Sequence, residues 1–261
     1  MAENSAKVEN SAVLVTGASR GIGRATARAF AELGHRVAVH CSSRRDDAEE
    51  TLSLLRGDGH AVLGGDLADP EAARTLVAEA VDRLGAVDVL VNNAAVAPTA
   101  SNRHRVGEAE WDVWTGAWQQ MFAVNLHGAV NVTWAVARHL VERGVPGAIV
   151  NVGSRGAFRG EADHPAYAAS KAALHAFGQS AAITLAPHGI SVTSVAPGFV
   201  ATERQAAKLG GAEGDGVRGQ SPFGRVGTPE EVAAAIVHLA SPGAQWASGA
   251  VLDLNGASYL R

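Results

Sequence analysis

Residues 16–23 read Thr-Gly-Ala-Ser-Arg-Gly-Ile-Gly, and this stretch decides the fold. It joins a short apolar run at 12–15, typical of a buried strand, to an amphipathic, helix-like stretch at 21–33. Glycines at such a turn let the backbone approach a ligand closely, and the helix N-terminus offers free N–H groups to a pyrophosphate. We therefore predict dinucleotide binding over a purely structural turn, through Gly17, Ser19, Arg20, Gly21, Ile22 and Gly23.

Apolar runs and helical stretches continue to alternate along the chain. The pattern predicts strands at 36–40, 61–63, 87–91, 148–152, 191–195 and 251–254, and helices at 46–56, 70–84, 118–143, 165–187 and 229–239. Strands separated by helices indicate βαβ units. We therefore expect an α/β fold: a single Rossmann-type, doubly wound parallel sheet of about seven strands with helices on both faces. A polar tail at 1–11 precedes one domain at 12–261.

Composition narrows the classes of partner. The 261-residue chain has a net charge of −4 and no basic run, which disfavours nucleic acid. No apolar run reaches the ~18 residues needed to cross a membrane, and the polar N-terminus lacks the apolar core of a signal peptide. The single cysteine, Cys41, excludes an intrachain disulfide and a multi-cysteine metal site, and the histidines show no ligand spacing. We expect a cytoplasmic protein without a metal.

Two rare residue types point to a reaction centre. Tyr167 and Lys171 lie four residues apart, on one face of the predicted helix at 165–187. The chain has only two tyrosines, and Lys171 is one of only three lysines among 22 basic residues. Ser154 lies thirteen residues before Tyr167, at the end of a predicted strand, where open α/β sheets bind ligands. Tyr-x-x-x-Lys alone is a weak motif, but these features together favour catalysis over a solvated helix face.

The turn spacing G-x-x-x-G-x-G and this Ser-Tyr-Lys pattern resemble the compact branch of the short-chain dehydrogenase/reductase family, from residue 12 to the C-terminus. The resemblance implies that Asn125, Ser154, Tyr167 and Lys171 form the catalytic set, with Asn125 holding a water in a proton relay. Tyrosine has an unperturbed pKa of ~10, and a nearby ammonium lowers that pKa by favouring the phenolate. The phenol can then donate a proton to a carbonyl that receives hydride, while the serine stabilises the developing negative charge on its oxygen.

The resemblance also implies further cofactor contacts, made by Asp66, Leu67, Asn93, Ala94, Ala95, Tyr167, Lys171, Pro197, Gly198, Val200 and Thr202. Ala95 departs from the family's Asn-Asn-Ala-Gly pattern by one methyl group. The second predicted strand lacks the acidic residue that holds a ribose hydroxyl, and Cys41 stands near that place. The residues Ser42, Ser43 and Arg44 follow, with Arg20 on the glycine turn, and these side chains suit a 2′-phosphate. We therefore predict NADP (NADPH), with NAD less favoured.

The sequence most resembles 3-oxoacyl-carrier-protein reductases, which implies interconversion of a ketone and a secondary alcohol on a small-molecule or acyl-thioester substrate. The alternatives are an NAD(P)-dependent alcohol, sugar or steroid dehydrogenase, and a non-catalytic dinucleotide-binding sensor. Residues 203–223 are rich in glycine and are predicted to form a mobile substrate lid, with a loop at 210–219. Trp111, Trp114 and Trp118 line a pocket or pack in the core or an interface. The alanine-rich helix at 165–187 and the apolar C-terminus, with only 18% charged residues in the chain, predict a homotetramer.

Overall fold

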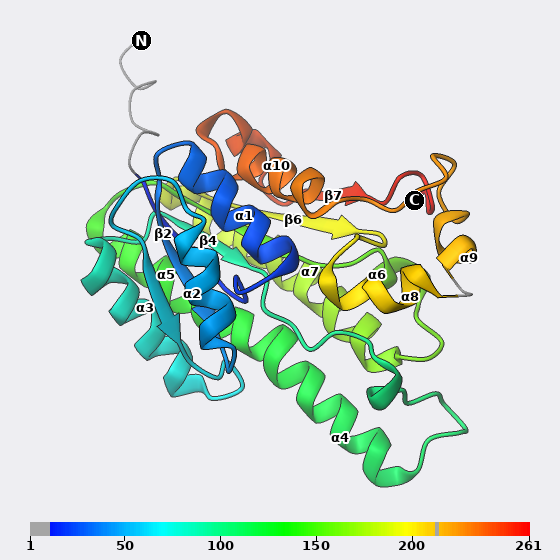
Figure 1. Ribbon diagram of the computed structural model, residues 1–261. Helices are drawn as coiled ribbons and strands as arrows, with labels where there is room; N and C mark the ends of the chain where they lie inside the picture. Colours follow the sequence, from blue (N-terminus) through cyan, green and yellow to red (C-terminus); the bar gives the residue numbers. More distant parts are fainter. Residues whose placement is uncertain (1–10, 212–213) are drawn as a thin grey trace.

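A single sheet of seven parallel strands forms the centre of the molecule (Figure 1). The computed structural model describes residues 11–211 and 214–261. The strands are β1 (Ala12–Val15), β2 (Arg36–Cys41), β3 (Ala61–Gly64), β4 (Val89–Asn92), β5 (Gly147–Val152), β6 (Ile190–Pro197) and β7 (Val251–Leu254). They lie in the order β3-β2-β1-β4-β5-β6-β7, and every pair is parallel. The predicted fold class is confirmed.

Helices cover both faces of the sheet. The helices α1 (Gly21–Glu32), α2 (Arg45–Ser53) and α10 (Pro229–Ala240) pack on one face, and α3 (Pro70–Leu84), α5 (Ala129–Arg143) and α7 (Pro165–Leu185) on the other. Side chains alternate between the faces, so Val13 and Val15 join the α1 core while Leu14 joins the α3 core. Because both faces are covered, the strands are continuously apolar, which is why their sequences could be recognised.

The first predicted turn lies where the strand order reverses. The strands β1 and β4 are neighbours, yet the chain goes from β1 to β2 on one side and from β4 to β5 on the other. A crevice forms at such a switch point, beyond the carboxyl ends of the strands, and ligands bind there. The fold therefore brings the turn after β1 and the segments after β4, β5 and β6 to one edge of the sheet.

Two predicted elements are wrong in detail. The predicted helix at 118–143 consists of α4 (Trp111–Phe122), a π-helical turn η2 (Ala123–Gly128) and α5. The predicted loop at 210–219 contains the end of α8 (Ala206–Gly210) and α9 (Gly214–Arg218), which follow the 3₁₀ turn η4 (Glu203–Gln205). Arg218 stabilises these short helices despite their glycines, because its guanidinium donates to the Leu209 carbonyl at 2.8 Å and to Asp215 at 2.6 Å. Positions 212–213 lie outside the described residues.

The remaining elements are short. They are the helix α6 (Gly156–Arg159) and the 3₁₀ turns η1 (Ala100–Asn102), η3 (Ala186–His188) and η5 (Pro242–Ala247). Among the described residues, no helix combines the length and the apolar character needed to cross a membrane.

Candidate active site

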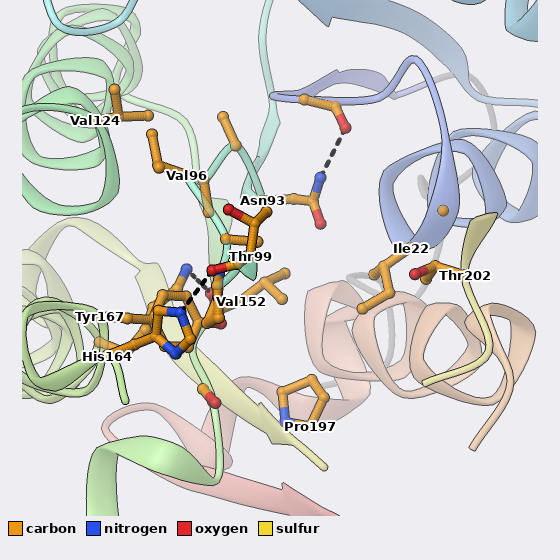
Figure 2. A pocket seen from close by; sticks show the side chains of 18 of the residues that line it. Ile22, Asn93, Val96, Thr99, Val124, Val152, His164, Tyr167, Pro197 and Thr202 are labelled. Atoms are coloured by element: carbon orange, nitrogen blue, oxygen red, sulfur yellow. Dashed lines mark hydrogen bonds between the residues drawn. The ribbon is translucent and has the colours of Figure 1, made fainter. Parts of the chain in front are cut away.

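A cleft of about 1240 Å³ opens along the carboxyl ends of the strands (Figure 2). Its walls contain nearly all of the residues predicted for the site: Gly17, Ser19, Arg20, Gly21, Ile22, Cys41, Ser42, Ser43, Arg44, Asp66, Leu67, Asn93, Ala94, Ala95, Ser154, Tyr167, Lys171, Pro197, Gly198, Val200 and Thr202. Gly23 and Asn125 do not line the cleft. The predicted nucleotide-binding and catalytic residues thus share one cavity.

The glycine turn packs too tightly for side chains at two positions. A Cβ on Gly17, whose φ is +63°, would lie 2.8 Å from the Ala94 Cα. A Cβ on Gly23 would lie 2.4 Å from the Gly17 carbonyl oxygen. Gly23 therefore supports the turn from behind instead of lining the cleft. Gly21 and Ile22 open α1, so their N–H groups have no acceptor within the helix and remain suited to a phosphate.

A buried histidine holds the turn in place. The Gly17 N–H donates to His40 Nδ1 at 3.1 Å, and His40 Nε2 lies 2.9 Å from the Gly65 carbonyl oxygen. Because a carbonyl oxygen only accepts, the proton lies on Nε2 and Nδ1 is the acceptor. Burial lowers the pKa of His40, against smaller opposing effects of Gly65 and Asp66, and so favours this neutral form. No role is predicted for this histidine from the sequence.

Side chains outside the glycine motif fix the rest of the turn. Arg24 donates to the Ser19 carbonyl at 2.8 Å and to Thr51 Oγ1 at 2.9 Å. The Asn93 amide donates to the Gly17 carbonyl at 2.9 Å, and its backbone N–H donates to Thr16 Oγ1 at 3.0 Å. Asn93 therefore ties the end of β4 to the phosphate turn.

The end of β2 carries hydroxyl and guanidinium groups. Cys41 is buried at the end of the strand, and burial raises the pKa of its thiol. Ser42, Ser43 and Arg44 follow along the cleft wall, where Arg44 forms an exposed ion pair with Asp47 at 3.3 Å. The Arg20 guanidinium makes no hydrogen bond or ion pair to any residue of the described chain, so it is available to a ligand.

Thr202 and Ala95 lie close to the glycine turn and to β4. The Thr202 Cγ2 would lie 3.2 Å from a Cβ on Gly21, which places this threonine beside the N-terminus of α1. Ala95 has a negative φ, since Ala257 is the one described non-glycine residue with a positive φ. The backbone at position 95 therefore does not require the glycine of the family pattern.

The reaction centre is formed by α7 and the end of β5. Lys171 is 2% exposed, and its Nζ donates to the Val152 carbonyl at 2.8 Å. The same Nζ lies 6.0 Å from the centre of the Tyr167 ring. Ser154 follows β5, and its Oγ accepts from the Gly156 N–H at 3.0 Å. The structure therefore places a buried cation, a phenol and a hydroxyl at one end of the cleft.

Asn125 lies in the π-helical turn, fully buried. Its Oδ1 accepts from the Val96 N–H at 2.7 Å, and its Nδ2 donates to Ser170 Oγ at 3.1 Å and to the Val96 carbonyl at 3.2 Å. The side chain therefore joins the segment after β4 to α7, behind the cleft wall. The prediction placed this residue in the catalytic set, but its side-chain amide is engaged by the protein.

Two further histidines organise the start of α7. His104 is fully buried, its Nδ1 lies 2.6 Å from the Asn102 carbonyl oxygen, and its Nε2 accepts from the Ala166 N–H at 3.1 Å. This bond satisfies a free N–H in the first turn of α7, whose own N-cap, His164, makes no side-chain cap. His164 lines the cleft and contacts the Thr99 carbonyl oxygen through Nε2 at 2.9 Å. Sequence analysis missed both residues.

The tryptophans of α4 lie outside the cleft. The ring centres of Trp114 and Trp118 lie 5.5 Å apart, and the Trp118 ring stacks on that of Phe122 with the same separation of centres. Trp111 is 73% exposed. Of the two roles predicted for the tryptophans, lining a pocket or packing, Trp114 and Trp118 have the second. No group of three His, Cys, Asp or Glu residues suited to a metal occurs within the described ranges.

Comparison with known proteins places this geometry in a family. The sequence matches the short chain dehydrogenase family over residues 11–211. An L-rhamnose 1-dehydrogenase (NAD(P)(+)) from a Sphingomonas species is 38% identical over 256 residues, which cover 97% of this chain and 98% of that protein. A 3-oxoacyl-(acyl-carrier-protein) reductase from Vibrio cholerae is 35% identical over 254 residues, covering 97% and 99%.

Solved structures agree with the sequence relatives. The crystal structure of a short chain dehydrogenase from Burkholderia cenocepacia in complex with NADP superposes with a TM-score of 0.85 at 30% identity, covering 97% of this chain and 99% of that chain. Fold, cleft and sequence therefore identify the chain as a member of the short-chain dehydrogenase/reductase family of NAD(P)-dependent oxidoreductases.

Proposed function

We propose that this protein is an NADP-dependent oxidoreductase that interconverts a ketone and a secondary alcohol. The observation that carries the proposal is the position of Lys171 Nζ, 6.0 Å from the centre of the Tyr167 ring, in the cleft that also contains the glycine turn. A phenol beside a buried ammonium is suited to exchange a proton with a substrate oxygen.

The cleft suits a dinucleotide on structural grounds. The close approach of Gly17 to Ala94 leaves no room for a side chain, and the first N–H groups of α1 have no intrahelical acceptor. The turn can therefore receive a pyrophosphate, with the nicotinamide end directed toward Ser154 and Tyr167. When bound, the nicotinamide ring supplies or accepts the hydride.

The residues of the chain would manage the proton. In the reductive direction, the Ser154 hydroxyl donates a hydrogen bond to the substrate oxygen as negative charge develops on it. Tyr167 gives its phenolic proton to that oxygen, and the Lys171 ammonium stabilises the phenolate that remains. Because the Asn125 side chain is engaged by Val96 and Ser170, a water in the relay would be held by the Asn125 backbone carbonyl.

The charges at the end of β2 favour NADP. The Arg20 guanidinium has no partner within the described residues, and Ser42, Ser43 and Arg44 also line the cleft. A 2′-phosphate would receive charge-assisted hydrogen bonds from these groups, and the position of Cys41 carries no carboxylate to repel it. NAD has no 2′-phosphate and would bind without these hydrogen bonds.

The substrate class has two candidates. Resemblance to 3-oxoacyl-carrier-protein reductases favours an acyl thioester, and a Vibrio cholerae relative bears that name. The relative named L-rhamnose 1-dehydrogenase favours a hydroxylated substrate. Arg159, Glu161 and His164 contribute polar groups to the lining of the cleft and support the second candidate.

The Tyr167→Phe variant tests the proposal against a non-catalytic sensor. We expect NADPH oxidation with a panel of ketones to fall by at least about 10²-fold, because the phenolic proton is lost. Binding of NADPH, followed by its fluorescence, should persist. Equal turnover by the variant and the wild type, or no turnover by the wild type with any ketone, would contradict the proposal.

A further inference from the structure

His164 lies at the reacting end of the cleft. It is the N-cap of α7, and the Tyr167 N–H donates to its carbonyl oxygen at 3.0 Å. Figure 2 shows the His164 and Tyr167 side chains among those that line the pocket. A substrate oxygen bound to Tyr167 therefore lies in the cleft that His164 also lines.

The protein fixes which nitrogen of His164 carries the proton. Nε2 lies 2.9 Å from the carbonyl oxygen of Thr99, which can only accept, so the neutral ring carries its proton on Nε2. Nδ1 is then a hydrogen-bond acceptor. No residue of the described chain donates to this nitrogen. The cleft thus holds an oriented acceptor on the residue that caps the helix of Tyr167.

The surroundings keep the His164 ring in this orientation. The His104 ring meets it edge-on with centroids 5.8 Å apart, and His104 is itself held by Asn102 and Ala166. The neighbouring Asp163 carboxylate is paired with Arg103 at 3.1 Å and with Arg105 at 3.2 Å. Its charge is therefore compensated without His164.

We infer that His164 is a specificity-determining residue whose Nδ1 accepts a hydrogen bond from a hydroxyl on the carbon next to the reacting carbon. This inference rests on the proposed function and names its substrate class: a vicinal hydroxyketone or diol, such as a polyol. A 3-oxoacyl thioester has carbon-bound hydrogens at both positions flanking its ketone, so it would leave Nδ1 without a donor. A site built around a hydroxyl discriminates against analogues that lack it.

Paired substrates test the inference with the wild-type enzyme. We expect kcat/KM with NADPH to be about tenfold higher for 3-hydroxybutan-2-one than for butan-2-one, the effect of one neutral hydrogen bond. The same ratio is expected for 2-hydroxycyclohexanone over cyclohexanone. Equal values for both pairs, or a higher value for acetoacetyl thioester than for the hydroxyketones, would overturn the inference while leaving the proposed function intact. Failure of every ketone would overturn both.

Two substitutions of His164 by side chains of similar size test the role of Nδ1 as an acceptor. His164→Asn and His164→Leu both lose the bond to Thr99, but asparagine keeps an acceptor close to the position of Nδ1. We expect the hydroxyketone-to-ketone ratio to fall to about 1 in His164→Leu and to recover several-fold in His164→Asn. His188→Leu, at an exposed position in η3 away from the cleft, should keep the wild-type ratio. A ratio that is the same in the Asn and Leu variants would show that His164 serves only to anchor Thr99.

Discussion

The imidazole of His40 joins the two loops that form the nucleotide end of the cleft. It accepts from the Gly17 N–H at 3.1 Å and donates to the Gly65 carbonyl at 2.9 Å. Gly17 belongs to the glycine turn, and Gly65 precedes the predicted cofactor contacts Asp66 and Leu67. The side chain is 1% exposed, so water cannot replace either bond. We therefore expect nucleotide affinity to depend on this buried residue of the second strand.

We predict that His40→Leu binds NADPH about fivefold more weakly, because the Gly17 N–H loses its buried acceptor. His40→Asn keeps an acceptor near Nδ1 and should recover part of the affinity. Fluorescence titration at neutral pH measures both dissociation constants, and melting temperatures show whether the variants remain folded. Equal affinity of the Leu and Asn variants would mean that the hydrogen bond to Gly17 does not position the turn.

We expect cofactor preference to depend on the side chain at the end of β2. We predict that Cys41→Asp shifts the ratio of kcat/KM for NADPH over NADH toward NADH by at least about tenfold. The new carboxylate would accept from the ribose hydroxyls of NADH and repel the 2′-phosphate of NADPH. Steady-state kinetics with both coenzymes measure the ratio, and an unchanged ratio would contradict the prediction.

Arg20→Gln is the complementary change. It should weaken NADPH more than NADH, because the guanidinium has no partner within the described chain and is free to meet the extra phosphate. As a control, Arg74→Gln removes an exposed arginine paired with Glu71 on α3. That variant should leave the coenzyme ratio unchanged.

Elements whose signals lie within a few neighbouring residues could be predicted from the sequence. The strands were recognised because burial on both faces makes them continuously apolar. The bounds of α3 agree with the prediction because Asp69 caps its N-terminus and Gly85, with a left-handed φ of 77°, ends it. The spacing of Tyr167 and Lys171 is also local, since one helical turn sets it.

The features that sequence analysis missed depend on distant contacts. His40 meets Gly65, and His104 meets Ala166, across 25 and 62 residues of chain. No periodicity links residues at such separations. The π-helical turn at Asn125 was missed because its sequence continues the helical pattern of α4 and α5. Likewise, the hydrogen bonds of the Arg218 guanidinium that stabilise α9 could not be predicted from a glycine-rich sequence.

Assembly can be tested on exposed apolar side chains. Ile183 in α7 is 76% exposed, and Trp246 and Leu260 in the C-terminal region are 101% and 81% exposed. These are the regions predicted to form subunit contacts, where a second copy of the chain would bury such exposed apolar side chains. We expect sedimentation at micromolar concentration to show a homotetramer and Ile183→Lys to shift the protein toward smaller species. Only monomer in the wild type would contradict this prediction.

His175 should make stability depend on pH. It lies one turn after Lys171 in α7, stacks on Phe158 with ring centres 5.2 Å apart and is 4% exposed. Burial, followed by the charge of Lys171, lowers the pKa of His175 from 6.5 to about 4. Between these two values the unfolded chain binds the proton and the folded chain does not, so stability falls as pH decreases. This loss of stability is negligible well above pH 6.5 and reaches about 3 kcal/mol at pH 4.

His175→Phe removes this titration and keeps an aromatic ring against Phe158. We expect its free energy of unfolding to fall less than that of the wild type between pH 7 and pH 4, in urea titrations at several pH values. His188→Phe, at an exposed position, serves as the matched control and should follow the wild-type curve. Parallel curves for His175→Phe and the wild type would mean that His175 is not the group that destabilises the fold in acid. Because buried His40 also has a lowered pKa, the His175→Phe protein should retain a smaller pH dependence of the same sign.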